Sequence, residues 1–225
     1  MENGVLTKYQ GKGGKVTIPD GVTTIGTSAF RNCTTVTSVI LPDSVTQINQ
    51  RAFAGCTALK SVTLSKKLAQ IDSEAFNGCT SLADIIIPNR VTRIGNLVFA
   101  RCTSLTSITI PDSVSRMGTQ VFFGCHSLAT IILSQHLKCI EVGMFQDCLS
   151  LKSLNIPASV TEIGVDAFKG CSALGMISLL ESVAIIKENA FGGCTGLKTA
   201  YVPKTTKYAK LFSPSFPRHT KIVKI

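Results

Sequence analysis

The chain has 225 residues, of which 44% are hydrophobic, 6% aromatic and 16% charged, and its formal net charge is +10. The apolar fraction excludes a disordered chain. No apolar run reaches the roughly 18 residues of a membrane-spanning helix, and the N-terminus lacks the apolar core of a signal peptide. The chain has 23 Lys and Arg but 13 Asp and Glu. Such an excess of positive charge is typical of proteins that bind nucleic acid or another anionic surface, so the location of these charges matters.

A period of 23 residues dominates the sequence. Eight phenylalanines follow this period, and a cysteine comes three residues after each of them. The phenylalanines are Phe30, Phe53, Phe76, Phe99, Phe122, Phe145, Phe168 and Phe191, and the cysteines are Cys33, Cys56, Cys79, Cys102, Cys125, Cys148, Cys171 and Cys194. One unit of this length cannot bury its own apolar face, so the period predicts a solenoid of stacked coils.

The chain is expected to begin with an N-terminal cap over residues 1–15, with a strand at 4–9 that turns through Gly11, Gly13 and Gly14. From residue 16 onward, each unit opens with alternating apolar residues that are closed by a proline in most units, such as Val39, Leu41 and Pro42. This alternation predicts a short strand with one buried face. Nine equivalent strands are expected, from 16–18 to 200–202. Ser65, Ser134 and Leu180 stand where the proline is missing.

The second half of each unit is predicted to hold another inward segment, such as Val22 and Ile25, followed by A-F-x-x-C. Phe and Cys at i and i+3 have the spacing of one inward-facing helical turn. The residue before Cys is Gly, Asn or Asp in seven of eight units, which predicts a left-handed turn there, with Arg101 as the exception. A similar turn is expected directly after the inward isoleucine, at Gly26, Asn49, Asp72, Gly95, Gly118 and Gly164.

The last segment, 204–225, departs from the period and is expected to be a C-terminal cap, in which Tyr208, Leu211, Phe212 and Phe216 cover the last coil. Pro214 and Pro217 argue against further helix or sheet in this segment.

The repeated pattern L-x-x-V-x-I-P-x-x-V-x-x-I-G-x-x-A-F-x-G-C resembles the leucine-rich repeat of the BspA-like (Treponema pallidum-type) class over residues 16–203. The resemblance implies a leucine-rich repeat horseshoe, a right-handed and mostly β superhelix of α/β class with about eight 23-residue coils. It also implies a non-enzymatic, protein-binding module of bacterial cell-surface, host-interaction or adhesion type.

The repeated cysteines could be interpreted as disulfide partners or metal ligands. Side chains stacked in register point in parallel, which does not suit the geometry of a disulfide. The sequence has no closely spaced pair of cysteines with histidine or acidic residues nearby, as a metal site would need. We interpret them as small buried side chains that pack coil on coil. Cys139 lies outside the series at a mostly polar position, between Arg116 and Glu162 and near His136. A reactive thiol is conceivable there, but no third catalytic group can be named.

Other catalytic and metal-binding patterns are not found. His126, His136 and His219 share no repeat position, and the sequence contains no nucleotide-binding, zinc-protease or nucleophile-elbow motif. Asp20 and its equivalents Asp43 and Asp112 stack after the prolines and are interpreted as solvated turn acids rather than paired catalytic carboxylates. We therefore predict no catalytic residues, no cofactor and no metal.

The candidate partner-binding face consists of the outward residue of each strand. These residues are Ile40, Thr63, Ile86, Thr109, Ile132, Asn155, Ser178 and Tyr201. Isoleucines two coils apart would form an apolar stripe with a border of Ser and Thr, which suits a protein, or a glycan, better than nucleic acid. The competing interpretation is that Thr and Ile are simply good strand residues.

The charge is concentrated at one end. Residues 1–197 carry a net charge of +3, whereas residues 198–225 carry seven basic residues and no acidic one. The basic excess therefore belongs to the C-terminal cap and does not predict specific nucleic-acid binding.

Two other functions stay open: a structural or self-associating scaffold and, more remotely, a glycan-active or hydrolytic enzyme. A monomer or weak dimer is expected. The location is open between the cell surface, by resemblance, and the cytoplasm, because no signal peptide is visible in this chain.

Overall fold

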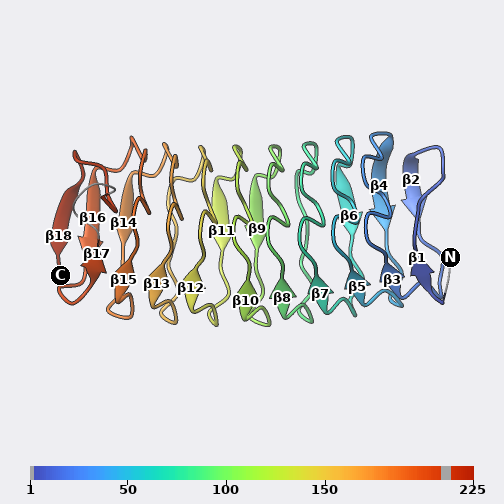
Figure 1. Cartoon of the computed structure of the whole chain (residues 1–225), viewed down its shortest axis with the longest axis horizontal. Helices are drawn as coiled ribbons and strands as arrows, with labels where there is room; N and C mark the ends of the chain where they lie inside the picture. Colours follow the sequence, from blue (N-terminus) through green and yellow to red (C-terminus); the bar gives the residue numbers. More distant parts are fainter. Residues whose placement is uncertain (1–2, 209–213) are drawn as a thin grey trace.

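The computed structural model describes residues 3–208 and 214–225. The chain forms a single row of stacked coils along the long axis of the molecule, with the two ends of the chain at opposite ends of the row (Figure 1). The coils form two rows of strands, and every strand pairing within the described residues is parallel. Across the described ranges, no helix is long and apolar enough to cross a membrane. The predicted leucine-rich repeat solenoid is confirmed.

The first row, which we call the long-strand row, has strands of three to five residues. Its strands in the described chain are β2 (Gly14–Thr17), β4 (Val36–Ile40), β6 (Ser61–Thr63), β9 (Ser107–Thr109), β11 (Thr130–Ile132), β14 (Met176–Ser178), β16 (Thr199–Val202) and β18 (Lys221–Lys224). They form three separate sheets, β2-β4-β6, β9-β11 and β14-β16-β18.

The second row, the short-strand row, has strands of two residues. Its strands are β1 (Val5–Leu6), β3 (Thr24–Ile25), β5 (Gln47–Ile48), β7 (Gln70–Ile71), β8 (Arg93–Ile94), β10 (Arg116–Met117), β12 (Cys139–Ile140), β13 (Glu162–Ile163), β15 (Ile185–Ile186) and β17 (Lys207–Tyr208). They form two sheets, β1-β3-β5-β7-β8-β10 and β12-β13-β15-β17, so the strand pairing is interrupted between β10 and β12.

Seven of the nine predicted strands of the long-strand row are present, but the segments at 84–86 and 153–155 are not strands. The prediction is wrong at these two coils, where Asp84 and Asn155 occupy outward positions. Asp and Asn are among the residue types that are depleted from strands. In the coil at 84–86 the inward side chains keep their positions in the core, since Ile85 and Ile87 are both buried.

The third side of each coil contains A-F-x-x-C, and the helical turn predicted there is not found in any described coil. The reason is that alternate amides donate to the next coil. Ser28 N, Phe30 N and Asn32 N donate to the carbonyls of Gln50, Ala52 and Ala54 at 2.9, 2.7 and 2.8 Å. Only turn-type hydrogen bonds remain within the coil, such as the one from Cys33 N to Phe30 O at 2.9 Å. Phe and Cys still face inward, but through consecutive turns.

Left-handed backbone occurs at two positions of each coil. All eight residues before the repeated cysteines have positive φ, including Arg101 at 59°, which the sequence marked as the exception. The second position is two residues later than predicted, at Ser28, Arg51, Glu74, Leu97, Gln120, Gly143, Asp166 and Asn189.

The glycines that prompted the second prediction serve close packing instead. A Cβ added to Gly95 would lie 2.5 Å from Ser73 N, and one added to Gly26 would lie 2.8 Å from Leu6 O. These glycines therefore let the backbones of successive coils approach each other.

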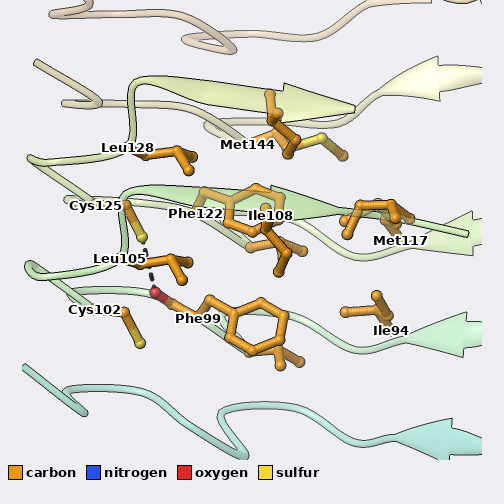
Figure 2. Packing of buried hydrophobic residues seen from close by; sticks show 14 of the residues in the cluster. Ile94, Phe99, Cys102, Leu105, Ile108, Met117, Phe122, Cys125, Leu128 and Met144 are labelled. Atoms are coloured by element: carbon orange, nitrogen blue, oxygen red, sulfur yellow. Dashed lines mark hydrogen bonds between the residues drawn. The ribbon is translucent and has the colours of Figure 1, made fainter. Parts of the chain in front are cut away.

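The core is a stack of similar layers. Each repeated Phe ring lies parallel to the next, with centroids 4.9 to 5.8 Å apart, and Tyr9 and Phe216 extend the ladder at its two ends. Phe99 and Phe122 lie one above the other, with Leu105, Leu128 and Ile108 packed beside them (Figure 2). The core thus runs without interruption from the first coil to the last.

The C-terminal segment adds strands rather than only covering the last coil. β17 pairs with β15, and β18 pairs with β16 at the register Thr199↔Lys221. The expectation that Pro214 and Pro217 exclude further sheet is wrong, because β18 begins after both prolines. Of the predicted covering residues, Phe216 is buried against Phe191, whereas Leu211 and Phe212 lie outside the described residues.

The strands at the two ends of the rows are β1, β2, β17 and β18, and all of them except β1 carry lysine. Lys15 lies in β2, Lys207 in β17, and Lys221 and Lys224 in β18. An open edge invites pairing with another chain, and lysines on it oppose such pairing by like-charge repulsion.

We expect the chain to sediment as a monomer, and we expect Lys207→Thr with Lys221→Thr to introduce concentration-dependent association. Sedimentation velocity over a hundred-fold concentration range measures this. A wild-type chain that already associates end to end would contradict the protective role of these lysines.

Candidate functional site

The outward residues of the long-strand row have the arrangement that the sequence predicted. Thr17, Ile40 and Thr63 are register partners on β2, β4 and β6, as are Thr109 and Ile132 on β9 and β11, and Ser178 and Tyr201 on β14 and β16. Ile40 and Tyr201 are half-buried, and Thr63, Thr109, Asn155 and Ser178 are exposed. The structure therefore places these residues on one side of the stack, interrupted at the two coils that lack a strand.

Among the large hydrophobic residues that the structure describes, two isoleucines of this row have the greatest exposed fractions. Ile86 is 83% exposed and Ile132 is 63% exposed, although both belong to coils with well-buried inward neighbours. They lie on alternate coils with Thr109 on the coil between them, which separates them by about 10 Å at the usual strand spacing. Because Thr is smaller than Ile, the intervening coil leaves a notch between the two apolar side chains.

A hollow of about 870 Å³ lies over this notch. It spans three consecutive coils, and its lining comes from 84–89, 107–113 and 130–132. It begins at the coil that lacks a strand, where the ladder ends at β6 and resumes at β9. The break in the sheet and the hollow therefore share the segment around Ile86.

The hollow has carboxylates but no basic side chain. Asp84 and Asp112 are among the residues that line it, and no Lys, Arg or His is. Asp112 is held in place because its Oδ1 accepts a hydrogen bond from Gln135 N at 2.8 Å, and its carbonyl oxygen lies 2.9 Å from His136 Nδ1. The rest of the lining is uncharged and about half of it is apolar, so the hollow combines apolar side chains with negative charge.

The predicted turn acids have a structural role in two coils. Asp43 Oδ1 accepts a hydrogen bond from Lys66 N at 3.0 Å, which matches the bond from Gln135 N to Asp112. In both cases the next coil carries serine in place of proline, and the serine hydroxyl accepts a second backbone amide: Lys67 N at Ser65 Oγ and His136 N at Ser134 Oγ. These contacts rebuild the turn that proline forms elsewhere.

The repeated cysteines are free thiols, and seven of the eight donate a hydrogen bond to a neighbouring coil. Cys125 Sγ donates to Phe99 O at 3.0 Å, the contact drawn as a dashed line in Figure 2. The same bond, at 3.0 to 3.3 Å, links every repeated cysteine from Cys56 to Cys194 to the phenylalanine 26 residues earlier. The sequence did not predict this role, although the fixed spacing of Phe and Cys contains the signal.

Cys139 does not have the surroundings of a nucleophile. The thiol is half-buried, and its register partner in the next coil is Glu162. Burial, together with the negative charges of Glu141 and Glu162, raises the pKa of the Cys139 thiol to about 12. A thiol with this pKa is protonated near neutral pH and is a poor nucleophile. His136, the suggested partner, contacts Asp112 instead.

No metal site is apparent in the part of the chain that the structure describes, where three or more His, Cys, Asp or Glu side chains nowhere gather closely enough to hold an ion.

Stacked coils of a recurring unit with leucine at fixed positions, whose strands pair in parallel from coil to coil, are typical of the leucine-rich repeat solenoids. The chain belongs to the BspA-type leucine-rich repeat family, whose model matches residues 8–128 and 93–217.

Several bacterial proteins of known structure are similar to the chain. The leucine-rich repeat protein of Treponema pallidum is 38% identical over 76% of this chain and 82% of its own, with a TM-score of 0.72. A leucine-rich repeat protein of Bacteroides ovatus is 24% identical over 94% of this chain and 69% of its own, with a TM-score of 0.68, and supports the fold alone. No protein in a search of curated proteins matches.

A third similar structure is described as a leucine-rich cell surface protein of Faecalibacterium prausnitzii. It is 32% identical over 83% of this chain, with a TM-score of 0.55, and this chain covers 59% of its length.

Proposed function

We propose that the chain is a non-enzymatic protein-binding module whose partner contacts the long-strand row at the hollow between Ile86 and Ile132. One observation carries this proposal: two large apolar side chains are 83% and 63% exposed on either side of a hollow. Leaving such side chains in water costs roughly 1.5 to 3 kcal/mol each relative to burial, so a partner that covers them gains affinity.

The setting we propose is the surface of a bacterium, in adhesion or host interaction. The cell surface protein of Faecalibacterium prausnitzii supports this location, because it shares the repeat over most of this chain. A structural or self-associating scaffold is the second candidate, since the same apolar side chains could pack against another copy of the chain.

The double variant Ile86→Asp with Ile132→Asp tests the proposal. We expect it to weaken binding of a partner isolated on the intact array at least 100-fold, because two carboxylates would replace the apolar contacts at the centre of the interface. We expect the melting temperature to stay within about 2 °C of the wild-type value, because both side chains already face solvent.

The matched control is Val142→Asp with Val165→Asp, which makes the same change at side chains that are 44% and 38% exposed on adjacent coils outside the hollow. Isothermal titration calorimetry measures all three proteins. Equal affinity of both double variants would refute the proposed site. If the bound partner proves to be the chain itself, and Ile86→Asp with Ile132→Asp abolishes that association, the scaffold function is favoured.

A further inference from the structure

We propose that the hollow selects an extended peptide segment in which an apolar side chain is flanked by lysine or arginine. This inference rests on the proposed function and specifies the chemistry of the partner. The occupant we infer is a segment of another protein, whose apolar side chain enters the notch over Thr109 while its cationic group lies beside Asp84.

The shape of the hollow supports an apolar anchor. Ile86 and Ile132 project from alternate coils, and Thr109 between them leaves a notch about two strand spacings wide. A single aliphatic or aromatic side chain fits between two isoleucines at this separation. The serine and threonine hydroxyls on the neighbouring outward positions, Ser107 and Thr130, can bond the backbone of an extended segment.

The charge of the hollow supports a cationic neighbour. Asp84 and Asp112 are the charged residues of the lining. Asp112 is already engaged with the backbone of the next coil, whereas the structure shows no hydrogen bond or ion pair of Asp84 within the described residues. Asp84 lies two residues before Ile86 on the same coil, so its carboxylate and the apolar side chain are about 7 Å apart along the chain. Complementary charge at this position favours Lys or Arg in the partner.

The surrounding surface sharpens the contrast. Lys60 is exposed one coil before the hollow and Lys152 one coil beyond it, at a repeat position that Ala83, Thr106 and Ala129 occupy on the three coils of the hollow. Arg90 is exposed in the turn after Ile87 but is not part of the lining. The charged side chains of the lining are therefore acidic, whereas basic residues surround the hollow. A peptide with acidic residues beside its apolar side chain would be repelled by Asp84 and Asp112. The local charge of the hollow, rather than the positive net charge of the whole chain, therefore sets the preference for the flanking residues of the peptide.

Peptide selection on the intact protein tests the inference. A random 12-residue library displayed on phage is selected on the wild-type chain and depleted on Ile86→Asp with Ile132→Asp. We expect enriched sequences with an aliphatic or aromatic residue next to Lys or Arg. A synthetic peptide of the enriched sequence should bind Asp84→Lys at least ten-fold more weakly than wild type, and its affinity for wild type should fall as NaCl is raised.

The matched control is Asp20→Lys, which makes the same charge change at an exposed turn acid near the N-terminus. It should leave the affinity within two-fold of the wild-type value. Thr109→Tyr, which fills the notch, should abolish binding without removing any charge, so loss through shape and loss through charge are measured separately.

The outcomes separate the two proposals. Enriched peptides with neutral or acidic flanks, or equal affinity for wild type and Asp84→Lys, would overturn the proposal of a cationic partner. If Ile86→Asp with Ile132→Asp still fails to bind those peptides, the proposed apolar site is retained. Peptides that bind this double variant as well as wild type, or a library that yields no enrichment, would count against both proposals.

Discussion

Raising the pH from 8 to 11 is expected to unfold the array in one steep, cooperative transition, because the core is lined by buried thiols. Burial raises the pKa of Cys79, Cys102 and Cys148 well above the usual value and raises that of Cys125 to about 12. The pKa of Cys171 is also raised well above the usual value, through its hydrogen bond with Cys194 and through burial.

The sign follows from proton linkage. Above the ordinary thiol pKa of about 8.5, the unfolded chain has lost the thiol protons while the folded chain retains them, so the unfolded state binds fewer protons and stability falls with rising pH. Stability is fully present below that pH and is lost as the pH rises toward the folded-state values. Each thiol contributes about 1.4 kcal/mol per pH unit, so five together contribute roughly 7 kcal/mol per unit. This exceeds the lower range of domain stabilities, about 5 to 15 kcal/mol.

Urea titrations between pH 7 and 10.5, under reducing conditions, measure the effect. Cys102→Ala with Cys125→Ala should reduce the slope of unfolding free energy against pH by about 2.8 kcal/mol per unit, because two of the titrating thiols are gone. The two proteins contain the same lysines and tyrosines, so the difference in slope reports the two thiols alone. Identical slopes would show that the buried thiols are not linked to unfolding.

Phe122→Ala is expected to lower the free energy of unfolding by about 4 kcal/mol, since it removes a fully buried aromatic ring and leaves a cavity in the middle of the stack. The Phe122 ring is fully buried, and its centroid lies 5.8 Å from that of Phe99 and 5.6 Å from that of Phe145. Because each coil contacts only its neighbours, the loss also uncouples the two halves of the array.

Phe216→Ala is the matched control at the end of the same ladder. Phe216 has one parallel neighbour, Phe191, at 4.8 Å and one edge contact with Tyr208. The end variant should cost less than half as much as the central one, and its urea transition should stay cooperative, whereas Phe122→Ala should broaden the transition. Equal costs for the two variants would contradict a stack that is held together by nearest-neighbour contacts.

The repeating core could be predicted from the sequence because each buried position recurs with the same period. The inward pairs of each strand, the Phe ladder and the buried cysteines all follow from the 23-residue spacing. The outward row from Ile40 to Tyr201 could be predicted for the same reason, since a residue between two inward neighbours of a strand must face the other way.

The features that the sequence did not predict depend on contacts between coils. The Phe–Cys spacing is compatible with a helical turn, and only the pairing of Phe30 N with Ala52 O in the next coil decides against it. Likewise, a left-handed conformation at Leu97 or Gln120 opposes the preference of those residues, so the stack imposes it from outside the unit. The hollow likewise depends on contacts between coils, because it lies where three coils meet, beginning at the coil of Asp84 that has no strand in the long-strand row.

Hydrogen–deuterium exchange of the intact chain, with and without a selected peptide or an isolated partner, tests the central claim most directly. If the partner occupies the hollow, exchange should slow in segments 84–87, 107–109 and 130–132, and the short-strand row should be unchanged. Protection confined to the short-strand row or to the ends of the stack, with those three segments unaffected, would contradict the proposed site.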